Sequence, residues 1–469
     1  MDTEDNIVAE KPNRKYSRRS IAFDEFRRKQ VSIFGGRAIP AAEHLMVLED
    51  HLDIAMRRRN HAYPLFKLQM ALLTDLITAE KAVADCKKKI EELKAASAEA
   101  ADIEAVSAEQ QRYTVLRRAL RDIGDGIAWR LLEYDRAALV ALASHARKPH
   151  INIEGLPAEL NAFADIWNSY SGSMLVLNDL THFLKKADIT VRRDADHFEF
   201  VEVKSSRTKS GTMSRQKADL AETLAFLNEQ GGERHGQTVR IRSLPVQPKG
   251  FFNAVCSTIR EAEKEGTAWA KIGEHLTVEF IDWSVVLRGG VEEPDMKKIE
   301  ESAAVAEKWG QAGDVVMPYI GAERYLFVRN VAPYSIFPFS APQRVKLMTN
   351  TLMTMSRLNV SAVTRYIASQ GWTLVHPPEF YVEEARKVLT TPPDDTAETA
   401  FDKLPVTPLA TFKKGALTLD LPATWAVRLA QEYLAPRTVL DVFESLLRTG
   451  PSKETATLIN FDGESDQWD

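Results

Sequence analysis

Apolar side chains in the first third of the chain recur at a helical period. Between residues 63 and 93, and again between 113 and 138, they follow one another at spacings of three or four, which predicts two long amphipathic helices. An Ala-, Glu- and Ser-rich stretch at 95–108 separates them and offers the chain a place to turn. We therefore predict an antiparallel helical hairpin, a device that proteins use for packing or oligomerisation, with Cys86 in its apolar stripe.

The pattern changes after Pro149, where β-branched and aromatic residues begin to alternate with polar ones. Short strands are predicted there, interrupted by one helix at about 213–228, and this order is typical of an α/β fold. Beyond residue 245 the pattern is mixed, with strands predicted at 276–286 and 325–331 and a helix from about Pro342. The strand candidates of the first group are 174–177, 189–192, 198–204 and 238–241.

Changes in composition and the positions of prolines divide the chain into five predicted segments. The first carries nine Lys or Arg between residues 11 and 37, which is typical of a mobile basic arm. Several prolines between residues 392 and 422 indicate a linker-like stretch near the other end. The segments are a basic, partly disordered arm (1–60), the helical hairpin (61–118), an α/β domain (119–245), a mixed α+β accessory domain (246–390) and a Pro-rich linker with a C-terminal helix and an acidic tail (391–469).

The overall composition excludes several classes of protein. Lys and Arg number 61 and Asp and Glu 66, so the net charge of −5 does not by itself indicate a nucleic-acid partner. The two cysteines, Cys86 and Cys256, lie far apart in the sequence, which argues against zinc fingers, iron–sulfur centres and a disulfide framework. The first residues lack the apolar core of a signal peptide, and the longest apolar run, 137–143, is far too short to span a membrane. We expect a cytoplasmic protein with no membrane partner.

The segment 187–204 carries the most informative chemistry. It is predicted to form two antiparallel strands around a polar three-residue turn at 194–196, closed by Arg193 and His197. This turn sets the register of the whole strand pair. In that register Asp188 lies directly opposite Glu202.

Lys204 follows Glu202 by two residues, so the pleat of the strand places both on one face. Like charges directly opposite each other destabilise a strand pair, and the two acids therefore need a cation. Mg²⁺ fits, because it uses one or two protein carboxylates and leaves positions for water and for phosphate oxygens. Lys204 could then orient the attacking water or neutralise developing charge. The chemistry implied is metal-assisted hydrolysis of a phosphodiester.

An acid at the start of one strand, followed by Glu-X-Lys at the end of the next strand and then a helix, resembles the PD-(D/E)XK nuclease superfamily. The resemblance covers about residues 120–244 and marks the domain at 119–245 as nuclease-like. It implies a restriction-endonuclease-like αβββαβ core, dependence on Mg²⁺ with Mn²⁺ as a substitute, and a nucleic-acid substrate, with DNA preferred. Asp188 and Glu202 match the metal-binding acids and Lys204 matches the signature lysine, whereas Ala187 replaces the proline of the family name. By analogy alone, the setting is prokaryotic antiviral defence or DNA processing.

The helix predicted after this motif carries a glutamine on its apolar stripe. Gln216 shares that stripe with leucines and therefore faces the sheet. It resembles a glutamine that some members of the superfamily carry in the equivalent helix, although Leu220 departs from the exonuclease-type Gln-x-x-x-Tyr pattern. A basic loop between the motif and the helix suits a polyanion approaching an acidic centre. The basic residues expected to bind nucleic acid are Arg207, Lys209, Arg215 and Lys217.

Members of the superfamily often add an acid from the preceding helix. The candidates in this chain are Asp125 and Glu133, and we expect Asp125 to be the third metal ligand. Asp179 competes with Asp188 for its role, but Asp179 lies further from Glu202 in the sequence and has no register argument. His182 and His197 lie near the motif, and neither is assigned a role.

A second class of function stays open. In this alternative the chain is a non-catalytic DNA-binding or scaffold protein that forms homo-oligomers or binds a protein partner through the hairpin. The segment 359–372 then serves as the recognition helix of a helix-turn-helix. The simpler interpretation of that segment is a packing helix that leads into a strand at 373–375.

Overall fold

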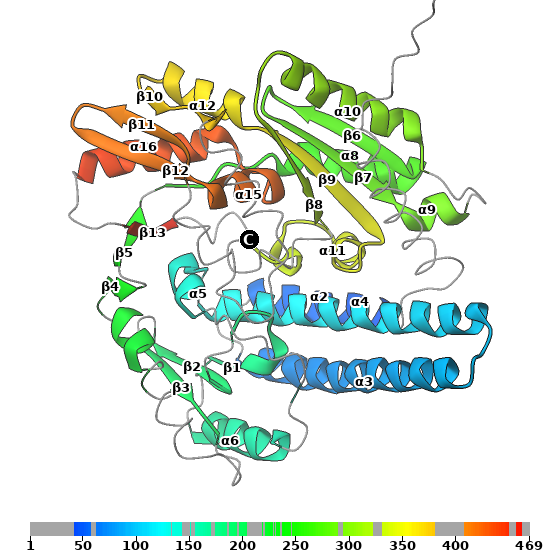
Figure 1. Cartoon of the computed structure of the whole chain (residues 1–469). Helices are drawn as coiled ribbons and strands as arrows, with labels where there is room; N and C mark the ends of the chain where they lie inside the picture. The colour runs from blue at the N-terminus through cyan, green and yellow to red at the C-terminus, as the bar shows by residue number, and fades with distance from the viewer. Residues whose placement is uncertain are drawn as a thin grey trace, which may run out of the picture.

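The structure is a computed structural model, and Figure 1 shows a mixed α/β architecture with several antiparallel sheets arranged around a long helical hairpin. It describes residues 42–57, 62–132, 134–142, 151, 155–169, 174–184, 187–194, 197–203, 218, 221–227, 229, 231–234, 237–244, 246–288, 294–321, 331–379, 408–449 and 456–461. No helix in these ranges combines the length and the apolar character needed to cross a bilayer.

Two long helices, α3 (Ala62–Ala95) and α4 (Ala100–Leu131), form the predicted hairpin, and Cys86 is buried in it (Figure 1). The prediction that a basic arm extends to residue 60 is wrong, because α2 (Ala42–Arg57) is a helix packed against α3 and α4. The predicted boundary between residues 118 and 119 falls inside α4. The helical spacing of the buried side chains explains why α2 folds onto the hairpin: these are Leu45, Leu48, Leu52 and Ala55.

The region between residues 134 and 244 is mixed α/β, with strands close to those predicted at 174–177, 189–192, 198–204 and 238–241. Its elements are α5 (Arg136–Leu142), α6 (Leu156–Ser169), β1 (Met174–Leu177), the short 3₁₀ helix η1 (Asn178–Leu180), β2 (Ile189–Asp194), β3 (His197–Val201), a helix at 221–227, β4 (Gly231–Arg234) and β5 (Gln237–Leu244). Strands β1, β2 and β3 form an antiparallel meander. Among the described strands, β5 pairs with β4 and with β13 (Ala456–Phe461) instead of joining β3.

The accessory region is built on a four-stranded antiparallel sheet of order β6-β7-β9-β8. The predicted strand 276–286 is wrong beyond Asp282, because the Asp282 carboxylate accepts the Ser284 N–H at 2.9 Å and a helix begins there. The predicted helix near Pro342 is present as α11. The elements are α8 (Phe252–Glu265), β6 (Thr267–Ile272), β7 (Leu276–Asp282), α9 (Trp283–Arg288), α10 (Met296–Gln311), β8 (Val316–Ile320), η3 (Tyr334–Ile336), α11 (Ala341–Met348) and β9 (Leu352–Asn359).

The described residues 408–449 and 456–461 pack onto or pair with earlier elements, and the predicted acidic tail at 462–469 lies outside the described residues. β10 (Thr373–His376) pairs with β11 (Pro408–Lys414), and β11 pairs with β12 (Leu417–Pro422). The helices α15 (Ala423–Gln431) and α16 (Pro436–Thr449) follow, and β13 returns to β5 in a parallel pair. The predicted segment 391–469 therefore contributes strands to two sheets.

The segment considered as a recognition helix forms α12 (Val360–Ser369), followed by β10. Val360, Val363 and Ile367 are buried, and α12 packs against α16. Arg365, its exposed cation, forms a two-point ion pair with Asp314 at 2.5 and 2.9 Å. These contacts are those of a packing helix.

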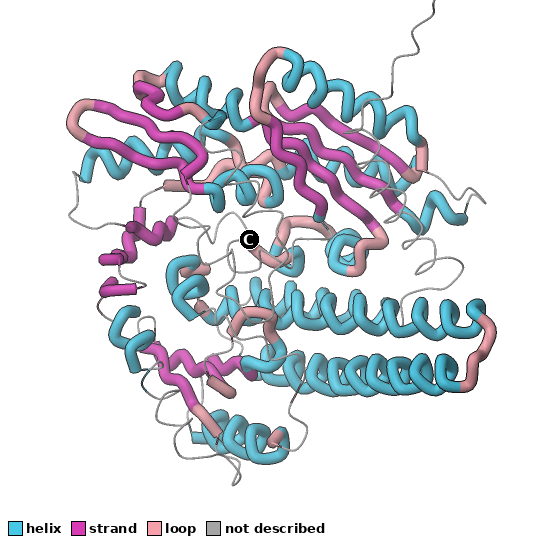
Figure 2. The backbone as a smooth tube through the Cα atoms, viewed as in Figure 1, coloured by secondary structure: helices cyan, strands magenta, loops and turns pink. Residues whose placement is uncertain are grey.

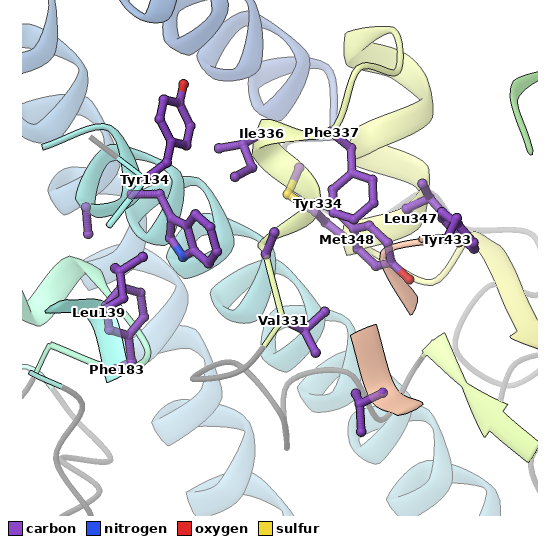
Figure 3. Close-up of a cluster of buried hydrophobic side chains, with 14 of the residues drawn as sticks. Tyr134, Leu139, Phe183, Val331, Tyr334, Ile336, Phe337, Leu347, Met348 and Tyr433 are labelled. Atoms are coloured by element: carbon purple, nitrogen blue, oxygen red, sulfur yellow. The ribbon is translucent and has the colours of Figure 1, made fainter. Parts of the chain in front are cut away.

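One apolar core runs through the molecule from α2 to α16, while the strands gather in separate groups around the hairpin (Figure 2). A buried ion pair also joins the two halves of the chain: Arg136 contacts Glu432 at 3.0 Å. Burial raises the pKa of Glu432, but the guanidinium groups of Arg136 and Arg428 outweigh burial and hold that pKa below its usual value. Figure 3 shows the neighbouring part of the core, where Leu139, Phe183, Tyr334, Phe337, Leu347 and Tyr433 gather from distant segments.

Candidate active site

The predicted register of the β2–β3 pair is confirmed. Ile189 pairs with Val201, Thr190 with Phe200, and the register continues to Arg192 and Phe198. The turn is different from the prediction, since the register shifts after Arg192 and the closing pair is Asp194 with His197. This shift leaves the opposite end of the ladder, where the candidate acids lie, unaffected.

Asp188 directly precedes the ladder and is fixed by backbone groups at the end of β3 and just beyond it. Its N–H donates to the carbonyl oxygen of Val201 at 3.1 Å, and its Oδ2 accepts the N–H of Val203 at 2.7 Å. Glu202 lies between these two valines and is partly exposed. The pair at this end of the ladder is Ile189 with Val201, so Asp188 and Glu202 both lie one residue beyond it, at the same end of the two strands. Asp188 itself is 8% exposed, which makes it a nearly buried carboxylate.

A turn after β1 holds Asp188 from the other side. The backbone N–H of Asn178 donates to the carbonyl oxygen of Asp188 at 2.9 Å. The side-chain amide of Asn178 donates to the carbonyl oxygen of Ala187 at 3.1 Å. The side-chain oxygen of Asn178 accepts the Thr190 hydroxyl at 2.9 Å. Both sides of Asp188 are therefore tied to fixed backbone. Sequence reasoning did not identify Asn178; the available signal was an amide residue directly after an apolar strand.

Asp125 lies buried in α4 and binds His182, which follows the same turn. The Asp125 Oδ1 accepts the His182 N–H at 2.7 Å, and Oδ2 lies 2.6 Å from the His182 Nδ1. Both carboxylate oxygens of Asp125, the candidate third metal ligand, are thus engaged by His182. Within the described ranges no three His, Cys, Asp or Glu side chains form a group that could hold a metal ion.

The α4 helix reaches this turn through residues spaced like one helix face. The Arg121 Nε lies 3.5 Å from the carbonyl oxygen of Asp179, and Arg121 also forms a buried ion pair with Glu80 at 2.8 Å. A Cβ at Gly124 would lie 2.1 Å from the Leu180 carbonyl oxygen, so only glycine permits the observed approach. Asp179, the competing candidate acid, is partly exposed and contributes its backbone carbonyl here.

The same turn of α4 contacts the accessory region on its other side. The Asp122 carboxylate accepts the N–H of Ser335 at 3.1 Å, and the Asp122 carbonyl oxygen accepts the Ser335 hydroxyl at 2.7 Å. A Cβ at Gly126 would lie 2.6 Å from that hydroxyl oxygen. One short stretch of α4 thus touches both the candidate site and η3.

The remaining predicted site residues lie outside the described residues. They are Lys204, Arg207, Lys209, Arg215, Gln216, Lys217 and the alternative acid Glu133. The predicted site residues that the structure describes are Asp125, Asp188 and Glu202. Two carboxylates at adjacent strand ends suit a hard cation that keeps several waters and takes phosphate oxygens as further ligands.

The chain matches no protein-family model, no curated protein and no solved structure.

Proposed function

We propose that the chain is a Mg²⁺-dependent nuclease of the PD-(D/E)XK type that hydrolyses phosphodiester bonds in DNA. The observation that carries this proposal is the register of β2 and β3, which brings Asp188 and Glu202 to the same end of neighbouring strands. Lys204 follows two residues later in the sequence and completes the Asp, Glu-X-Lys pattern.

The donor set suits Mg²⁺, because both candidate ligands supply carboxylate oxygens and Glu202 is partly exposed. When bound, the metal would lower the pKa of a coordinated water and stabilise charge on the phosphate. The backbone of β3 and the Asn178 turn hold Asp188 in one place, so its carboxylate needs little reorganisation before binding a ligand. In this proposal Lys204 orients the attacking water or neutralises charge that develops on the phosphate.

The basic residues after the motif are proposed to hold the DNA backbone. Arg207, Lys209, Arg215 and Lys217 fall within eleven residues that contain no acid. Contacts of this kind neutralise phosphates and position the duplex without reading its sequence. They also offset the repulsion between the nucleic acid and the two carboxylates.

A cleavage assay on supercoiled, linear and single-stranded DNA tests the proposal. We expect cleavage with Mg²⁺, no cleavage with EDTA, and loss of cleavage in Glu202→Gln and in Lys204→Ala. Glu199→Gln is the matched control, because Glu199 lies on the same strand but alternation places it on the opposite face from Glu202. Salt-sensitive DNA binding without any cleavage would instead favour the alternative of a non-catalytic DNA-binding or scaffold protein.

A further inference from the structure

We propose that Asp125 and His182 are positioning residues of the candidate site, and that Asp125 acts through His182 and not as a metal ligand. This inference rests on the proposed nuclease function. It deepens that function by naming what holds Asp188 in place.

The first argument is the way in which the Asp125 carboxylate is used. Both of its oxygens contact one residue, the backbone N–H of His182 at 2.7 Å and the ring Nδ1 at 2.6 Å. Asp125 is 1% exposed, so these oxygens have little access to water or to a metal ion. A carboxylate bound to Nδ1 fixes both the orientation and the tautomer of an imidazole ring.

The second argument is the continuity of the turn between His182 and Asp188. The carbonyl oxygen of Asn178 accepts the Thr181 N–H at 3.0 Å and the Thr181 hydroxyl at 2.8 Å. The Thr181 hydroxyl oxygen in turn accepts the Leu184 N–H at 3.0 Å. The turn is therefore one hydrogen-bonded unit, with Asp125 bound at His182 and Asp188 bound at Asn178.

The third argument is the helix that carries Asp125. Arg121, Gly124 and Asp125 each contact a different residue of the turn, and their spacing places them on one face of α4. The His182 Nε2 is buried and has no hydrogen-bond partner among the residues that the structure describes. Within the part of the chain that the structure describes, the ring is therefore hydrogen-bonded through Nδ1 alone, so loss of the Asp125 carboxylate should release it.

Single-turnover cleavage by the full-length chain separates positioning from metal binding. We expect Asp125→Ala and His182→Ala each to slow cleavage by about 10–100-fold, which is the usual effect of removing a residue that holds a metal ligand in place. The double variant should be no slower than either single variant, because both act in one pathway. The Mg²⁺ concentration for half-maximal rate should not change. Asp125→Asn should recover part of the rate, because its amide oxygen still accepts the His182 N–H.

Two kinetic outcomes would overturn the inference. A tenfold higher Mg²⁺ requirement in Asp125→Asn, with His182→Ala unaffected, would make Asp125 a metal ligand. If the fold-loss in the double variant equals the product of the two single fold-losses, the two residues act separately. Asp314→Asn is the matched control, since it alters a carboxylate bound to Arg365 in the accessory region and should leave the cleavage rate unchanged.

Hydrogen exchange tests the positioning without any cleavage. We expect amides between Asn178 and Val203 to exchange about tenfold faster in both Asp125→Ala and His182→Ala. Unchanged exchange there would refute the positioning role even if the chain cleaves DNA. Faster exchange in the two variants, together with a wild-type chain that cleaves no DNA, would instead retain the positioning role and refute the proposed nuclease function.

Discussion

The carboxylate of Asp188 accepts the backbone N–H of Val203 at 2.7 Å, so this candidate metal ligand also closes the end of the β2–β3 pair. Two substitutions at Asp188 separate its structural role, accepting the Val203 N–H, from its proposed role as a metal ligand. Asp188→Asn keeps an oxygen that can accept the N–H, whereas Asp188→Ala leaves it without an acceptor. We expect both variants to lose Mg²⁺-supported cleavage. Urea denaturation should show a loss of about 1–3 kcal/mol for alanine and less for asparagine. Cleavage at the wild-type rate by the asparagine variant would move the metal site elsewhere.

The salt dependence of DNA binding tests the basic loop. Changing Arg207 and Lys209 together to alanine should weaken binding similarly across DNA sequences, because phosphate contacts carry no base information. Losing two phosphate contacts should reduce the log–log salt slope by roughly 1.8. The matched control changes Lys87 and Lys89, two exposed lysines of α3, to alanine and should leave the slope unchanged. An unchanged slope in the loop variant would show that the loop is a solvated surface.

A methyl group at Gly124 should be costly, because the nearest atom is the Leu180 backbone oxygen, which cannot move aside as a side chain would. We expect Gly124→Ala to lower the free energy of unfolding by about 1–3 kcal/mol and to slow cleavage. Gly310→Ala is the control: nothing lies within 4 Å of a Cβ at Gly310 in α10, so its helix propensity should raise stability by up to about 1 kcal/mol. Equal stability of the two variants would contradict the close approach of α4 to the turn.

Stability should depend on pH through Glu49. Burial raises the pKa of Glu49 to about 8, although Arg344 lies 2.6 Å away and lowers it. The folded chain then holds a proton that the unfolded chain has released, so stability is greatest below pH 4.5 and falls as the pH rises towards 8. One proton contributes a slope of at most about 1.4 kcal/mol per pH unit. Urea denaturation between pH 5.5 and 7.5 should show this slope in the wild type and lose it in Glu49→Gln. An identical slope in both chains would assign the dependence to other groups.

Local patterns in the sequence predicted the hairpin and the β2–β3 register. Both depend on the spacing of side chains within one or two neighbouring elements, and Leu116 and Val191 are buried as that spacing requires. The turn was less predictable, because the register shift after Arg192 depends on backbone geometry and not on side-chain periodicity.

The rest of the fold depends on contacts between segments that are distant in sequence. β5 pairs with β13, which lies more than 200 residues later, and no local pattern of Val239 or its neighbours indicates that partner. The link between Asp125 and His182 spans 57 residues and became visible only when α4 was placed on the turn. Beyond Asp282 the strand-like pattern of the sequence continues, but the Asp282 carboxylate accepts the Ser284 N–H and a helix begins there.

The contacts of α4 around Gly124 lie near the C-terminal end of the helix. The opposite end of the hairpin, where α3 meets α4, is therefore a place to modify the molecule. Residues 94–97 are exposed, and the closed end of the hairpin projects away from the sheets (Figure 1). Deleting one residue near Gly124 would rotate the following turn by about 100° and separate α4 from its partners on both sides. Residues added between Ala96 and Glu99 would leave that helical phase unchanged. The tip is therefore a suitable attachment point for a fluorophore or an affinity tag during cleavage measurements.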